Sequence, residues 1–272
     1  MKFGRPESKT EKLDRGEFFQ EKLEQLAPEL KMQAEKLNKF GFDVDENCRV
    51  KMEAFLGPVP IKEIKDDLTL TKKLKAKFEK ESAASPEKKA EKAVGEALEV
   101  TKTSGVNSHW FGGRFIAVRS SEYDDMCGNK VDNLIFDTIT REPLAAIDAT
   151  TNQAAKLKDQ KEIIQKVLNG AEVKYGYALE ETKEAPGYKA VKKANQKLPY
   201  FIISFDGDEL EGMMRDLAGG VESDELVESS MRLIGKLKEQ AESFSKHPAV
   251  NPDIKAAYGR FLKIFEKSGR PA

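Results

Sequence analysis

The sequence predicts an α/β (α+β) fold: a mixed β-sheet core with an N-terminal helical layer and C-terminal helices. Up to about residue 100, apolar residues recur at three-, four- and seven-residue intervals, which is the period of amphipathic helices. Between about residues 113 and 207, short runs rich in β-branched and aromatic residues alternate with turn residues and indicate strands. The helical period then returns, and helices on both sides of a strand-rich segment are typical of a sheet packed between them.

The helical part of the chain follows a polar stretch. Residues 1–15 have no apolar pattern and predict a flexible tail. The N-terminal helical segment covers 16–104, and a kink is predicted before Pro28 in its first helix, 16–40. The other helices predicted in this segment span 48–56, 64–82 and 85–100.

The predicted α/β core covers residues 105–210. Its strands are expected at "RFIAVRS" (114–120), "NLIFD" (133–137), "LAAIDAT" (144–150), "AEVKYGYALE" (171–180) and "LPYFIISFD" (198–206). A hairpin joins the second strand to the third, and a helix over 153–168 follows it. We expect the first, second, third and last of these strands to share one sheet, and helices to fill most of 211–272.

Composition excludes several classes of protein. The chain has 46 basic and 47 acidic residues among 272, so its net charge exerts no bulk attraction on nucleic acid or membrane. The distant Cys48 and Cys127 predict two reduced thiols in a cytoplasmic protein. The N-terminus shows no signal peptide, and no apolar run is long enough to cross a membrane. The two Cys and two His residues also lack the paired spacing of a zinc site.

Acidic residues concentrate between residues 120 and 151. Among them are Glu122, Asp124, Asp125, Asp132, Asp137 and Asp148. Asp148 lies in the apolar run "PLAAIDAT", where an uncompensated carboxylate is costly. Because the predicted hairpin brings Asp132 opposite the region of Asp148, and Glu122 can approach from the preceding segment, we expect these three to bind Mg²⁺ or Mn²⁺.

This order of acids resembles the PD-(D/E)XK nuclease core. In that core a helix often supplies a Glu, an Asp starts the second strand, and the third strand carries acid-X-Lys. The matching residues are Glu122, Asp132 in "KVDNLIFD" and Asp148 in "AIDAT", within about residues 108–207. The resemblance implies a sheet of the restriction-endonuclease-like type and Mg²⁺- or Mn²⁺-dependent phosphodiester cleavage of DNA or RNA.

Two departures from the nuclease pattern concern the catalytic residues. Val131 replaces the Pro of the motif, and Thr150 stands where the Lys that orients the attacking water is expected. A lysine of the next helix can take over that role, and the candidates are Lys156, Lys158 and Lys161. Segments such as "HWFGGRFIAVRSSEYDD", "VDNLIFD" and "AAIDAT" also resemble an uncharacterised family of bacterial hypothetical proteins, which implies a shared core and no substrate.

The remaining candidates each have a structural alternative. His109 is a candidate acid or base, or packs with Trp110 and Phe111. Arg119, and with it Thr150, is a candidate contact to substrate phosphate, while Arg119 could equally hold the acids in place.

For several of the acids, too, a structural role competes with the metal site. Asp124 and Asp125 could cap a helix, and Asp137 could close a turn. Asp148 could pair with Arg119 or Arg114, or cap the following helix.

Three functions are therefore considered. The first is a metal-dependent nuclease, with catalytic candidates Glu122, Asp132, Asp148, Lys158, Lys161 and His109. The second is a catalytically inactive nuclease fold that binds a protein partner through its helical segments. The third, a magnesium-dependent nucleotidyltransferase, ranks lower because "DNLIFD" separates its aspartates by four residues and no Gly-Ser turn precedes them.

Overall fold

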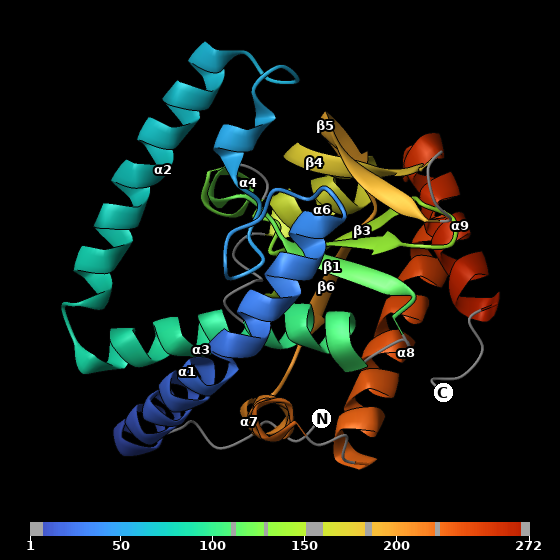
Figure 1. Ribbon diagram of the computed structural model, residues 1–272. Coiled ribbons are helices and arrows are strands. Elements are labelled where there is room, and N and C mark those ends of the chain that lie inside the picture. The colour runs from blue at the N-terminus through green and yellow to red at the C-terminus, as the bar shows by residue number, and fades with distance from the viewer. Residues whose placement is uncertain are drawn as a thin grey trace.

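The structure is a computed structural model in which a mixed sheet is surrounded by helices (Figure 1), so the predicted fold class is confirmed. It describes residues 8–109, 113–127, 130–150, 160–182, 187–220 and 224–267. Within these ranges, no helix is both long enough and apolar enough to cross a membrane.

Three long helices form the N-terminal layer: α1 (Lys9–Lys39), α2 (Ile61–Ser82) and α3 (Pro86–Ser104). α1 begins earlier than predicted because Ser8 and Glu11 form a capping box, so residues 9–15 are helical and not a tail. α1 also continues as one helix through Pro28.

The helix predicted over 48–56 is wrong. Arg49 instead forms a parallel bridge with Arg119, with Val50 N–H donating to the Arg119 carbonyl and Arg119 N–H to the Cys48 carbonyl. Only Met52–Phe55 turns helically, as a short 3₁₀ segment. Pairing with a strand distant in sequence therefore outweighs the local helical pattern.

The central sheet has the strand order β1 (Phe115–Arg119), β2 (Asn133–Asp137), β3 (Pro143–Thr150) and β6 (Tyr200–Ser204). β2 is antiparallel to both of its neighbours, whereas β6 is parallel to β3. The prediction that these four segments share one sheet is confirmed. Helix α6 (Gln160–Asn169) lies on the connection from β3 to β6, and residues 151–159 of the helix predicted there lie outside the described residues.

A second sheet consists of the hairpin β4 (Ala171–Glu181) and β5 (Tyr188–Leu198). β4 was predicted, but β5 has no counterpart among the predicted strands. Its exposed positions are dominated by lysine, and only Ala190, Gln196 and Leu198 are buried, so the apolar alternation is faint.

The chain ends in α7 (Gly207–Gly219), α8 (Asp224–Lys246) and α9 (Pro252–Lys267). α8 contacts β6 and α9 contacts β3, while α3 contacts β1, β2 and β3. The short helix α4 (Glu122–Met126) lies between β1 and β2 in sequence and packs against α2 and β4. The C-terminal part of α3 and the start of β2 are therefore held together beside α4.

Candidate metal centre

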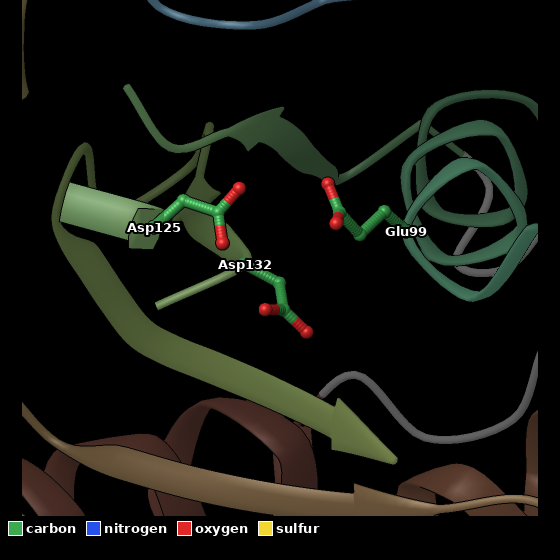
Figure 2. Close-up of side chains that lie close together, drawn as sticks. All are labelled: Glu99, Asp125 and Asp132. Atoms are coloured by element: carbon green, nitrogen blue, oxygen red, sulfur yellow. The ribbon is translucent and has the colours of Figure 1, made fainter. Parts of the chain in front are cut away.

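Three carboxylates from separate elements converge near the start of β2. Glu99 comes from α3, Asp125 from α4, and Asp132 immediately precedes β2 (Figure 2). We call these three residues the acidic cluster. Ser121 caps α4 by accepting a hydrogen bond from the Asp124 N–H, which fixes the start of the helix that carries Asp125.

The spacing within the acidic cluster suits one small cation. Each residue offers a carboxylate oxygen, and these oxygens all lie within 4.8 Å of one another. Two oxygens bound to one Mg²⁺ at about 2.1 Å lie at most about 4.2 Å apart. Small side-chain movements would therefore bring all three oxygens to ligand distance.

Buried cations surround the acidic cluster. Arg49 contacts both Glu99 (2.8 Å) and Asp125 (2.9 Å). Arg119 contacts Glu99 at 2.5 Å and Glu96 at 2.7 Å, and Lys102 Nζ lies 2.8 Å from Asp132 Oδ2. These contacts hold the carboxylates in position before any ligand arrives.

Carboxylates outnumber cations among these ion pairs of the described residues. Glu96, Glu99, Asp125 and Asp132 share Arg49, Lys102 and Arg119. One negative charge is therefore in excess when all four acids are ionised. Glu96 is the most exposed of the four acids, with 41% of its side chain accessible, so water offsets part of this excess, and a proton or a metal ion at the acidic cluster would remove it.

The pKa shifts separate the three acids. Burial raises the pKa of Asp125 to about 7, and the nearby Glu99 charge adds to this although Arg49 opposes it. The pKa of Asp132 is also raised, first by burial and then by the charges of Asp148 and Glu99, against the opposing effect of Lys102. Burial acts on Glu99 too, but Arg119 and Arg49 outweigh it and lower its pKa. The ionised form is therefore favoured for Glu99, whereas burial favours the protonated form of Asp125 and Asp132.

Asp125→Asn should therefore stabilise the metal-free protein in a pH-dependent way. The pKa of Asp125 is about 7 in the folded chain against an ordinary 3.8, so its favourable contribution is complete below pH 3.8 and is lost as pH rises through 7. Asn does not ionise, so the variant does not lose this stability as the pH rises. The free energy of unfolding in urea with a chelator is measured for both proteins. The advantage of the variant over the wild type should grow by roughly 1–3 kcal/mol from pH 5 to pH 8.

Asp66→Asn is the control for this pH effect, because Asp66 is an exposed carboxylate on α2. Its difference from the wild type should not change between the two pH values. A gain for Asp125→Asn that stays constant with pH would contradict the proposed titration.

Asp132 and Asp148 lie close together, as predicted, but face different partners. Asp132 N–H donates to the Ile147 carbonyl and Asp132 Oδ2 accepts from Ala149 N–H, so these contacts bracket Asp148 on β3. The Asp148 carboxylate accepts a 2.7 Å hydrogen bond from the Tyr200 hydroxyl. Asp148 is not a member of the acidic cluster, although its charge acts on Asp132.

Glu122 and Arg119 differ from their predicted positions. Glu122 is not in the acidic cluster and forms a 2.6 Å ion pair with Lys75 on α2. Glu99, on the helix that precedes β1, lies where Glu122 was predicted to lie. Arg119 is only 1% exposed, which prevents the predicted contact with substrate phosphate. It holds acids in place, as the alternative expected, but those of α3 and not Asp148.

Of the lysines predicted to replace the motif Lys, the structure describes Lys161 alone. Lys161 is exposed on α6, whereas Lys156 and Lys158 lie outside the described residues. Thr150 is the last residue of β3 and its carbonyl accepts from Phe205 N–H. The buried ammonium at the acidic cluster belongs to Lys102, whose side chain is 3% exposed.

The predicted acid or base His109 lies in the chain just after α3. His109 ends the π-helical turn Gly105–His109, and its expected neighbours Trp110 and Phe111 lie outside the described residues.

Asp124 and Asp137 both have structural contacts. Asp124 is buried and accepts from the backbone N–H groups of Lys174 and Tyr175, which ties α4 to β4. Asp137 pairs with Arg114 at 2.9 Å and accepts from Thr140 in the hairpin turn.

Glu99, Lys102 and Arg49 were not predicted as site residues. A signal for the first existed, since Glu96, Glu99 and Thr103 recur at i, i+3 and i+7 on a helix that also buries apolar residues such as Ala93 and Val100. Charged residues at such spacing are usually taken as a solvated face. Arg49 carried no signal, because it lies 50 residues from its partner Glu99.

The comparisons with known proteins add no family or relative. Neither protein-family models, nor curated protein sequences, nor solved structures match this chain.

Proposed function

We propose that the chain is a Mg²⁺- or Mn²⁺-dependent nuclease whose metal ligands are Glu99, Asp125 and Asp132. The observation that carries this proposal is the convergence of three carboxylates, two of them with raised pKa values, from α3, α4 and the start of β2. Hard divalent cations take oxygen ligands of this kind.

The order of elements supports the nuclease class among metal-dependent enzymes. A helix with Glu99 precedes β1, Asp132 opens β2, Asp148 lies on β3, and α6 precedes β6. This order agrees with the PD-(D/E)XK core that the sequence resembles, with Glu99 taking the place of Glu122. In the sheet order β1-β2-β3-β6, Asp132 lies just before β2 and Asp148 on the adjacent β3, and this neighbourhood supports the proposal.

The surrounding residues fit hydrolysis of a phosphodiester. A bound divalent cation would polarise the phosphate and lower the pKa of a bound water. Lys102 would orient that water or neutralise charge developing on the phosphate, in the role of the Lys absent at Thr150. Arg49 and Arg119 would keep Glu99 ionised and in position.

Metal-dependent cleavage tests the proposal directly. Single- and double-stranded DNA and RNA are incubated with the protein and Mg²⁺, Mn²⁺ or a chelator, and we expect cleavage only with metal. Metal should also raise the melting temperature, because a ligand at 100 times its Kd stabilises the folded state by about 2.7 kcal/mol. Absence of both cleavage and stabilisation would refute the proposal.

A catalytically inactive nuclease fold is the second candidate, and one observation favours it. The guanidinium groups of Arg49 and Arg119 both form ion pairs with Glu99, so the negative charge of its carboxylate is balanced without a metal ion. If the protein is an inactive nuclease fold, it should bind nucleic acid or a protein and should not cleave nucleic acid with Mg²⁺, with Mn²⁺ or with a chelator. The same incubations, analysed for bound and cleaved substrate, distinguish the two.

A further inference from the structure

Helix α2 carries a basic face whose lysines form no ion pair with the acidic cluster among the described residues. Its lysines Lys62, Lys65, Lys72, Lys73, Lys77 and Lys80 are all exposed. At 100° per residue they lie on one side of the helix, and Asp66 is the acid that accompanies them. Of the six, only Lys77 has an ion pair within the described part of the chain, a 3.9 Å contact with Glu81.

The opposite side of α2 is turned toward the protein. Ile64, Asp67 and Thr71 are buried there, and Lys75 on the flank pairs with Glu122 of α4. α2 lies at the periphery of the molecule (Figure 1, left), and the six lysines of its basic face are exposed. The side chains that anchor the helix are therefore not the ones available to a partner.

The charge of this face contrasts with the balanced charge of the whole chain. Basic and acidic residues nearly cancel overall, so six lysines on one face are a local concentration. From Lys62 to Lys80 the face extends about 27 Å at 1.5 Å per residue. One strand of B-DNA places roughly eight phosphates over that length, at about 3.4 Å each.

We infer that the basic face of α2 binds the phosphate backbone of the nucleic-acid substrate. The inference rests on the proposed nuclease function and adds to it the surface that holds the substrate. α2 contacts α4, which carries Asp125, through the side opposite the basic face, so the helix that bears the face is anchored on an element of the acidic cluster. Lysine contacts of this kind bind without reading sequence.

A membrane surface is the competing partner, and the composition of the face argues against it. Membrane-bound amphipathic helices place a large apolar side in the lipid, but the apolar side of α2 is packed on the protein in its first half. Three large apolar side chains of α2 are also exposed, Ile61, Leu70 and Phe78, but at 100° per residue none of them lies within the arc of the six lysines.

The test is a charge-neutralising triple variant, Lys65→Gln, Lys72→Gln and Lys73→Gln. Binding to a fluorescent 24-nucleotide duplex and to its single strand is measured by anisotropy in Ca²⁺ at several salt concentrations. We expect the affinity to fall about tenfold or more, and the slope of log K against log salt to decrease by roughly 2–3 for the duplex. Gln preserves helix propensity, and circular dichroism checks folding.

The matched control is Lys12→Gln, Lys31→Gln and Lys36→Gln, which removes the same charge from exposed positions of α1. It should lower affinity less than threefold. Equal losses in the two variants would overturn the inference, as would unchanged binding by the α2 variant. If the wild type cleaves nucleic acid in Mg²⁺ while the α2 variant keeps its affinity and KM, the surface is wrong and the nuclease proposal stands. A wild type that neither binds nor cleaves overturns both, and α2-dependent binding only to phosphatidylserine vesicles would assign the face to membranes.

Discussion

Asp132→Asn is expected to lower metal-dependent cleavage by about 100-fold or more and to abolish stabilisation by Mg²⁺ or Mn²⁺. Asp132 is the residue at which the acidic cluster, the Lys102 ammonium and the charge of Asp148 meet. Asn has the same shape and can still accept from Ala149 N–H, so the loss isolates the charge. Initial cleavage rates and melting temperatures with and without metal measure it.

The control is Glu122→Gln, which the structure places outside the acidic cluster in an exposed pair with Lys75. Its cleavage rate and its metal-dependent melting shift should match those of the wild type. The reverse outcome, with Glu122→Gln inactive and Asp132→Asn active, would mean that the metal binds elsewhere. Retained metal stabilisation in Asp132→Asn would exclude this residue as a ligand.

Arg119→Met is expected to reduce the free energy of unfolding by roughly 3–5 kcal/mol, because it removes one partner from a buried ion-pair network. Arg119 is 1% exposed and joins β1 to α3 through Glu96 and Glu99. Without it, Glu99 remains buried with less compensation, and its lowered pKa should rise. Urea unfolding at pH 7.5 with a chelator measures the change.

Arg260→Met is the matched control, since Arg260 forms a 3.2 Å pair with Glu142 and both side chains are largely exposed. Exposed pairs contribute at most about 1 kcal/mol. If the two arginine variants lose the same free energy of unfolding, burial does not make the ion pairs of Arg119 more stabilising than an exposed pair, and the prediction is wrong.

Local periodicity predicted a large part of the fold. Helix α2, the four strands of the central sheet and the C-terminal helices follow from apolar spacing, because this spacing shows which side of an element is buried. It also singled out Asp132 and Asp148, since a carboxylate at or within an apolar strand is conspicuous. The hairpin between them is short, so its register was predictable from sequence order.

Periodicity was weakest where a segment depends on contacts far along the chain. Residues 48–56 have a helical pattern, yet residues 48–50 pair with the end of β1 some 70 residues later. β5 is rich in lysine and forms a strand because β4 pairs with it along its length. In both segments the tertiary partner, and not the local sequence, determines the backbone.

The sequence by itself determined most of the helices, the four strands of the central sheet, and which acids stand in costly positions. Only the tertiary structure decided which acids meet. Lys102 lies 30 residues from Asp132 and Arg49 lies 50 residues from Glu99, and the spacing of these charges on helices and loops resembles that of solvated charges. The physical reason is that periodicity reports the face an element buries, whereas a site depends on which buried faces come together, and that is set by packing of the whole chain.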